Sequence, residues 1–285
     1  MTRALVPGLY ELIVTRGLEA ALEAIDRRAI HVERRELDPA DAHLVLAHHG
    51  YEVLVRALAA LPGEDEDRLH AQVGLLNAVI ESLHRALVNA GLAEEFVTSA
   101  AEELRALVTR GVLPMGEVPR VERPGIPLAA SALLVNARDE HRVGHELRRE
   151  LASADEVDLI CAFIKWNGLR LLEQDVRAVL DRGGRLRVLT SVYLAATEGD
   201  AIDALCRWGA DVRVSYDTRR TRLHAKAWLF RRNSGFSTAY IGSSNISVSA
   251  LVDGLEWNVR LSRVDVPEVL EKFQGFRWLL GGPRV

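Results

Sequence analysis

The sequence predicts an α/β fold whose sheet is flanked by helices, preceded by an all-helical N-terminal region. Three observations lead to this prediction. Apolar residues recur at helical spacing in residues 1–112, a segment with four prolines and two glycines follows at 112–128, and short apolar runs then alternate with amphipathic stretches. The last pattern is typical of strands that alternate with helices. We therefore expect a helical accessory domain at residues 1–112, a linker at 113–128 and an α/β domain at 129–285.

The N-terminal region contains four segments with helical periodicity, at residues 9–24, 38–61, 67–89 and 93–110. Asp38 is a favourable N-cap residue for the second segment, and the Pro-Gly pair after residue 61 ends it. The acidic stretch that follows this pair indicates a solvated loop between helices.

The α/β domain is expected to begin with a helix at residues 131–151 and to end with one at 266–278. The elements expected between them are helices at 169–180 and 200–208 and strands at 157–164, 186–191, 211–216, 225–230, 239–242 and 256–262. Alternating strands and helices predict a largely parallel sheet with helices on both faces. In such sheets ligands bind beyond the carboxyl ends of the strands.

Charge is distributed unevenly along the chain. The net charge is −4, which argues against a non-specific nucleic-acid coat protein. Residues 1–112 carry 11 basic and 18 acidic residues, whereas the remainder carries 25 and 22. The basic residues are therefore concentrated in the α/β domain.

The chain is expected to be cytoplasmic. Its longest apolar runs are strand-sized, so no membrane span is expected, and the N-terminus is interpreted as the start of a folded helix and not as an export signal. Cys161 and Cys206 lie in no metal-binding or redox spacing, which favours two buried thiols in a reducing compartment. The ending GGPRV is what we expect either of a fragment or of a stand-alone version.

The most informative segment lies between residues 216 and 260. His224 and Lys226 are two positions apart on an expected strand, so their side chains share one face. The next strand ends in Gly-Ser-Ser-Asn at residues 242–245, and the third begins with Glu256 and Asn258, again on one face.

These residues resemble the signature of the phospholipase D (HKD) superfamily, in which H-x-K is followed by G-S-x-N after a hairpin. His224, Lys226, Gly242, Ser243 and Asn245 match it in order. The aspartate of the signature is absent, because Arg231 stands near its position. In the branch that includes metal-independent restriction endonucleases a downstream glutamate belongs to the site instead, and Glu256 is placed to match. More widely, residues 8–275 resemble the N-terminal phospholipase D-like region of bacterial proteins that carry a superfamily-2 helicase.

The resemblance implies a phosphodiesterase that uses neither metal nor cofactor. His224 is the expected nucleophile and forms a phosphohistidine, while Glu256 fixes the tautomer of its ring. The expected donors to the nonbridging phosphate oxygens are Lys226, Asn245 and Ser243. Superfamily members use two H-x-K motifs, one as nucleophile and one as acid, and this chain has one. We therefore expect a homodimer in which the two copies of His224 meet in one composite site.

The expected substrate is DNA, because basic residues surround the motif. The candidate substrate-binding residues are Arg219, Arg220, Arg222, Ser244, Asn258, Lys165 and Trp166. The resemblance implies a nuclease in a helicase-linked DNA repair or phage-defence system. No Walker A motif is present, so a helicase would be a separate partner chain or a fused portion outside this sequence.

Several alternatives stay open at this point. With Arg231 in place of the usual acid, the site could bind DNA without cutting it, as a nucleic-acid-binding or scaffold module. A phospholipid-processing enzyme is a further alternative, but it calls for an apolar membrane-facing segment that the sequence does not contain. The arginine run could be a solvated loop, and Trp166 could be a core or rim aromatic residue. The strandedness and sequence specificity of the substrate, and the identity of the proton donor, are also open.

Overall fold

The computed structural model describes residues 5–6, 12–26, 28–40, 42–87, 90–107, 122–135, 143–217, 219, 222–252 and 254–273. The chain divides into two compact units, Met1–Arg105 and Ala106–Val285, which we describe separately. Most of the expected linker and the candidate residue Arg220 lie outside the described residues. Among the described helices, none combines the length and the apolarity that a membrane span requires.

The N-terminal unit is helical, as predicted. It contains α1 (Arg16–Glu23), α2 (Ala42–Ala59), α3 (Asp65–Ala86) and the short 3-10 helix η1 (Leu92–Glu95). The helix predicted at residues 93–110 is wrong, because the chain beyond η1 is not helical as far as residue 107. The physical reason is that the side chain of Asn77 in α3 takes the place of helical backbone partners for Val97. It donates to Val97 O at 3.0 Å and accepts from Val97 N at 2.9 Å.

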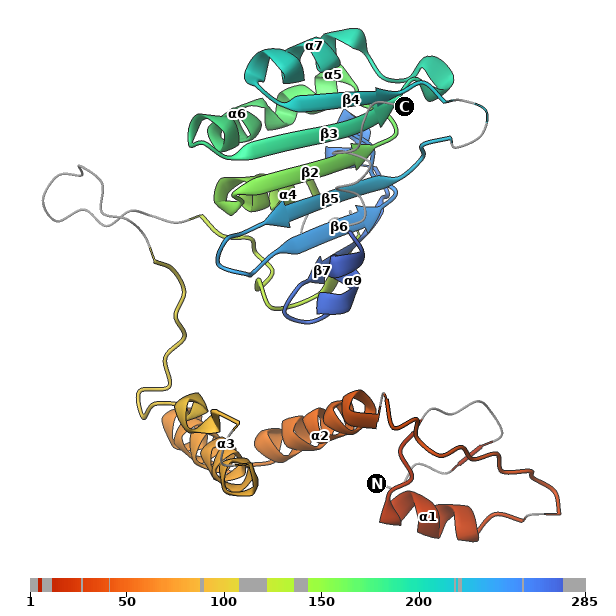
Figure 1. Ribbon diagram of the computed structural model, residues 1–285, viewed down its shortest axis with the longest axis vertical. Helices are drawn as coiled ribbons and strands as arrows, with labels where there is room; N and C mark the ends of the chain where they lie inside the picture. The colour runs from red at the N-terminus through yellow and green to blue at the C-terminus, as the bar shows by residue number, and fades with distance from the viewer. Residues whose placement is uncertain are drawn as a thin grey trace, which may run out of the picture. The chain divides into compact units, whose positions relative to one another are not determined.

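The α/β unit is built on one seven-stranded sheet with the order β1-β7-β6-β5-β2-β3-β4 (Figure 1). The strands are β1 (Ala132–Val135), β2 (Glu156–Cys161), β3 (Arg185–Ser191), β4 (Asp211–Ser215), β5 (Lys226–Arg231), β6 (Thr238–Gly242) and β7 (Trp257–Ser262). The predicted strands are therefore confirmed, with small shifts at their ends.

The prediction of a largely parallel sheet is wrong. Only β2–β3 and β3–β4 are parallel, and the four other pairs are antiparallel. The connection between β5 and β6 is too short for a crossover, so these strands form a hairpin. The helix predicted at 131–151 is also wrong in its first part, because β1 pairs along β7 there and the helix α4 (Val143–Ser153) begins later.

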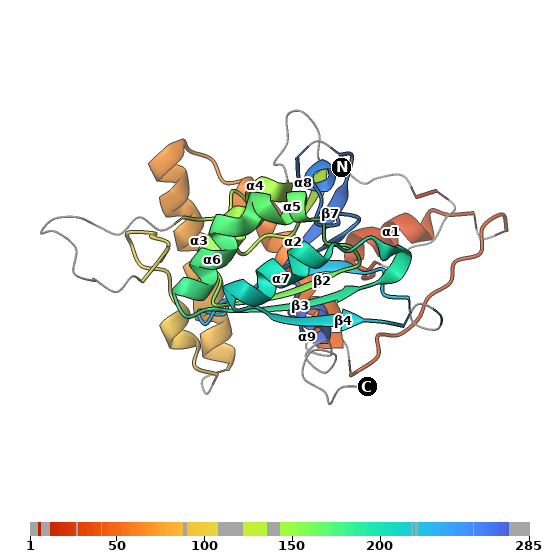
Figure 2. The ribbon, with the colours of Figure 1, turned by 90° about the horizontal axis from the view of Figure 1, so that it is seen from above.

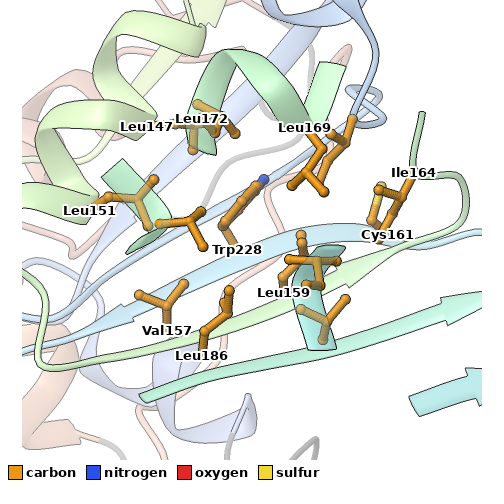
Figure 3. Close-up of a cluster of buried hydrophobic side chains, with 14 of the residues drawn as sticks. Leu147, Leu151, Val157, Leu159, Cys161, Ile164, Leu169, Leu172, Leu186 and Trp228 are labelled. Atoms are coloured by element: carbon orange, nitrogen blue, oxygen red, sulfur yellow. The ribbon is translucent and has the colours of Figure 1, made fainter. Parts of the chain in front are cut away.

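Helices cover the two faces of the sheet unequally (Figure 2). One face carries α4, α5 (Trp166–Leu169), α6 (Glu173–Asp181), α7 (Gly199–Trp208) and α8 (Val248–Val252), with the 3-10 segments η2 (Arg170–Leu172) and η3 (Tyr193–Ala195) between them. The main core lies between these helices and the strands, and Figure 3 shows Trp228 of β5 packed among leucines of α4, β2 and β3. On the opposite face, α9 (Pro267–Lys272) packs Leu270 on Ala227, Leu229 and Ala239.

A buried charge cluster ties α4 to the antiparallel strands. Glu150 of α4 is fully buried and accepts hydrogen bonds from Arg232 at 2.6 Å and Arg260 at 3.0 Å. Thr238 and Tyr240 donate to the same carboxylate at 2.8 and 3.1 Å. Two guanidinium groups thus share one carboxylate. Removing any one of these three charged groups would leave a buried charge without its partner.

Candidate active site

The candidate site lies at one edge of the sheet. Strands β2, β3, β4 and β6 run in one direction and end at this edge, whereas β5 and β7 run in the opposite direction and begin there (Figure 1). The register pairs Cys161 at the end of β2 with Lys226 at the start of β5, and Gly242 at the end of β6 with Asn258 near the start of β7. The H-x-K and G-S-S-N segments therefore meet at the same edge.

His224 and Lys226 are in direct contact. The ammonium nitrogen of Lys226 lies 2.9 Å from His224 Nδ1 and 3.2 Å from Nε2, and it donates to the backbone oxygen of His224 at 2.9 Å. An ammonium group can donate only to a ring nitrogen that carries no proton, so the tautomer of His224 decides which of the two contacts is a hydrogen bond. Partial burial lowers the pKa of Lys226, while Cys161 and Glu256 act in the opposite direction. The imidazole itself is exposed and accessible to a substrate.

Ser243 and Glu256 form a second pair. The hydroxyl of Ser243 donates to Glu256 and accepts from the backbone N–H of Trp257 at 3.1 Å. In the part of the chain that the structure describes, no hydrogen bond joins Glu256 to His224, which differs from the expected contact. The β6–β7 ladder explains the difference, because Ser243 N donates to Trp257 O and this pairing places Glu256 beside Ser243.

Asn245 is oriented by backbone and thiol groups of β2 and the loop after it. Its side-chain oxygen accepts from Phe163 N at 3.2 Å and lies 3.7 Å from Cys161 Sγ. Burial raises the pKa of the Cys161 thiol to about 11, so the thiol keeps its proton and remains a donor. Within the described part of the chain no hydrogen bond engages the NH₂ of Asn245, so this group is available to donate to a ligand.

Ser244 and Asn258 were predicted to bind substrate, but the structure places both below the surface of the site. Both are buried, and the Asn258 amide donates to the Ser244 hydroxyl at 2.8 Å. The first residue of the G-S-S-N segment has a steric role. A Cβ at Gly242 would lie 2.2 Å from Trp257 O and 2.4 Å from Asn258 Oδ1, so only glycine allows this close approach of β6 and β7.

The predicted binding residues on the β2 side are committed to neighbours. Lys165 forms an ion pair with Glu198 at 3.4 Å, and Trp166 N donates to the same carboxylate at 2.7 Å, which lowers the pKa of Glu198. The Trp166 ring packs against Trp208 of α7 and lines a shallow cavity of about 650 Å³ over that helix. Cys206 lines the same cavity and is exposed, so the prediction that both cysteines are buried is wrong for Cys206.

The described arginines of the basic run lie on the surface of the unit. Arg219 is exposed and its backbone N–H donates to Asp217 at 2.9 Å, while Arg222 is also exposed. Arg231, which stands in place of the signature aspartate, lies on β5 beside Asp158 of β2, with 3.2 Å between the charged groups. The aspartate of the signature is therefore replaced by an arginine, whose charge is neutralised by Asp158.

Two aromatic residues of the site were missed by the sequence analysis. Phe163 meets the His224 ring edge-on, with 5.8 Å between centroids, and it lies 6.5 Å from Tyr193 with the two rings nearly parallel. Both residues follow the ends of strands and belong to no local motif, so only the order of β2 and β3 in the sheet brings them to the site. Among the described residues, no group of three or more His, Cys, Asp or Glu is arranged to hold a metal ion.

The segment that carries the motifs matches a known family of proteins. Residues 147–277, which contain the H-x-K and G-S-S-N segments, match the sequence model of a family described as cardiolipin synthase, PLD-like domain. The fold is that of a phospholipase D-like domain. No curated protein sequence matches the chain significantly.

Solved structures with a similar chain path include two of about the size of this domain. NucT from Helicobacter pylori is 15% identical, with a TM-score of 0.41 over 53% of this chain and 94% of its own. Nuc from Salmonella typhimurium, described as a phospholipase D family member, is 16% identical, with a TM-score of 0.38 over 53% and 96%. Yeast tyrosyl-DNA phosphodiesterase is 10% identical, with a TM-score of 0.31 over 46% and 31%.

Proposed function

We propose that this chain is a phosphodiesterase that cleaves DNA through a phosphohistidine intermediate on His224. The observation that carries the proposal is the presence of an exposed imidazole, the Lys226 ammonium and the Asn245 amide, whose oxygen is held by Phe163, at one edge of the sheet. A nucleophile surrounded by fixed donors is what attack on an anionic phosphodiester requires.

In the proposed reaction a ring nitrogen of His224 forms a bond to phosphorus and the bridging P–O bond breaks. Lys226 and Asn245 donate to the nonbridging oxygens, where negative charge accumulates. The leaving oxygen takes a proton from an acid, and the same group then removes a proton from the water that hydrolyses the phosphohistidine. The Ser243 hydroxyl, held by Glu256, is the next donor beside these oxygens.

The acid is proposed to be His224 of a second copy of the chain, so that one composite site serves a homodimer. An apolar surface beside the site supports a second copy. It lies on the sheet face opposite α4, where Leu133 of β1 and Ile241 of β6 are both paired with Val259 of β7. Its members are between 40% and 61% exposed: Leu133, Ile241, Trp257 and Val259. The surface is continuous with the site, because Ile241 precedes the G-S-S-N segment and Trp257 follows Glu256.

The remaining parts of the proposal concern the partners of the domain. The exposed Arg219 and Arg222 are proposed to contact the DNA backbone, together with Arg220, and the acidic helical region at residues 1–112 is proposed to act as an accessory or docking module. The linker at 113–128 would join it to the phospholipase D-like catalytic domain at 129–285. The proposed context is helicase-linked DNA repair or defence in the cytoplasm.

The proposal is tested by cleavage of labelled DNA in excess EDTA, comparing the wild type with His224→Ala. His145→Ala, a change of an exposed histidine on α4, is the matched control. We expect cleavage by the wild type and the control, no cleavage by His224→Ala, and an acid-labile phosphoryl label on the wild-type protein when turnover is quenched. DNA binding without cleavage by any variant would refute the proposed enzyme. It would favour the second candidate function, a non-catalytic scaffold, which is suggested by Arg231 in place of the signature aspartate.

The composite site is tested by mixing wild-type protein with an excess of His224→Ala. If each site needs two histidines, activity falls with the square of the wild-type fraction; a linear fall would refute the shared site. Trp257→Glu should produce monomers in sedimentation, because it places a charge on the apolar surface. Val264→Glu is the matched control, since Val264 is equally an exposed residue but lies beyond the other end of β7.

A further inference from the structure

An aromatic platform lies directly beside the proposed nucleophile. It consists of Phe163, after β2, and Tyr193, after β3, whose rings are inclined by only 20°. Phe163 contacts the His224 ring edge-on, so the platform and the nucleophile form one continuous surface. The proposed phosphoryl transfer does not require either ring, which leaves the platform without a role in that chemistry.

The loop that carries Tyr193 is held in a costly conformation. Leu194 and Ala195 have left-handed backbone angles, with φ of 58° and 49°, although neither is glycine. Such residues persist only where the surrounding structure fixes them, and they cluster at ligand sites. Here Val192 N donates to Ser215 O at 3.1 Å and the Thr197 hydroxyl donates to Ser191 O at 2.8 Å, which anchors the loop on both sides of Tyr193.

Arg222 adds a positive charge beside the two aromatic rings. The guanidinium carbon of Arg222 lies 5.9 Å from the centroid of the Tyr193 ring, within the range of a cation–π contact. Arg222 is exposed and belongs to the segment that leads into His224. Arg222 thus lies over the Tyr193 ring, and its flexible side chain must move aside for a base to stack there. Aromatic faces and flat guanidinium groups are both surfaces on which proteins stack unpaired bases.

We propose that Tyr193, supported by Phe163 and Arg222, forms a nucleobase subsite in which the base next to the scissile phosphate stacks on the tyrosine ring. The inference rests on the proposed function and names its substrate class: DNA that is single-stranded, or unpaired at the cleaved position. A base within a duplex is stacked between its neighbours and cannot reach the ring without leaving the helix.

The subsite is tested first by binding, in a background that cannot cleave. A single strand carrying the fluorescent base 2-aminopurine is titrated with the His224→Ala protein, and stacking on Tyr193 is expected to quench its fluorescence. The quenching should be lost with His224→Ala/Tyr193→Leu and kept with His224→Ala/Tyr193→Phe, which retains the ring. Phe236→Leu in the same background is the matched control, because Phe236 is a partly exposed ring in the β5–β6 turn at the other end of the sheet.

The second arm measures cleavage. On single-stranded DNA we expect Tyr193→Leu to lower kcat/KM by about 10- to 100-fold, the range that loss of one stacked base implies. On a strand whose nucleotides around the cut are abasic, the same substitution should change the rate by less than about 2-fold, because that strand has no base to stack. Duplex DNA should be cut more slowly than the single strand by the wild type.

The two arms separate the subsite from the proposed function. Quenching that depends on Tyr193, in a protein that never cleaves DNA, would refute the nuclease and support the subsite. Cleavage that depends on His224, with quenching unaffected by Tyr193→Leu, would overturn the subsite and leave the nuclease standing. Equal loss of activity on abasic and base-bearing strands would also overturn it, since the ring would then act on the phosphate or on folding.

Discussion

The buried carboxylate of Glu150 allows a quantitative prediction about the stability of the α/β unit. It accepts four side-chain hydrogen bonds, which come from Arg232, Thr238, Tyr240 and Arg260. Glu150→Gln keeps the shape of the side chain but removes its charge and turns one acceptor oxygen into a donor. Two buried guanidinium groups then lose their shared counter-ion. Breaking a buried ion pair by changing one partner costs about 3–5 kcal/mol.

We therefore expect the free energy of unfolding in urea to fall by about 3–5 kcal/mol with the m value unchanged. Glu173→Gln is the matched control, because it removes one partner of an exposed ion pair with Arg177 at 3.4 Å and should cost less than about 1 kcal/mol. A loss for Glu150→Gln as small as that of the control would refute the reasoning. The carboxylate would then be replaceable by solvent, and the cluster would not tie α4 to the strands.

Three further predictions concern the candidate site. Asn245→Asp keeps an oxygen for the Phe163 N–H but replaces the amide donor with a charge that repels phosphate, so single-turnover cleavage should fall at least ~100-fold with an unchanged Tm. Residual activity above a tenth of the wild-type rate would contradict this. Gly242→Ala brings a Cβ within 2.2 Å of a β7 carbonyl oxygen and should cost about 1–3 kcal/mol in urea, whereas Gly199→Ala, with open space around it, should cost less than half of that. Because burial lowers the pKa of Lys226, cleavage should decline as the pH rises through that lowered value, earlier than for an ordinary lysine. A pH–rate profile that Lys226→Arg does not shift to higher pH would contradict this.

The positions of the strands could be predicted from the sequence, but their directions could not. A short segment rich in apolar residues, such as that of β2, indicates a buried strand, because burial on both faces favours such residues. The direction of each strand depends on its connection, and the short turn after β5 forces a reversal that a count of alternating elements does not reveal. The sequence predicts helix where β1 lies, because the four residues of β1 form a strand only through pairing with β7, more than a hundred positions later in the chain.

The candidate site was predictable to the extent that its residues are neighbours in sequence. His224, just before β5, contacts Lys226 at the start of that strand, and the G-S-S-N segment begins at the end of β6, the other strand of the same hairpin, so local spacing was sufficient. Phe163 and Tyr193 come from two parallel strands that are joined by helices, and no spacing rule links them to His224. The expected bond between Glu256 and His224 also depended on three-dimensional pairing, which gives that carboxylate to Ser243 instead.

The site lies where the parallel part of the sheet meets the antiparallel part. The antiparallel strands β5, β6 and β7 and the residues at their ends contribute His224, Lys226 and the G-S-S-N segment, which in our proposal act on the phosphate. The parallel strands β2 and β3 contribute Phe163 and Tyr193, which in our proposal contact the base. His224 lies where these halves meet, because β5 is the antiparallel strand that pairs with β2. Substitutions in the β3 loop should therefore change which nucleotides are cut, whereas substitutions in the β5–β7 half should change whether any is cut at all.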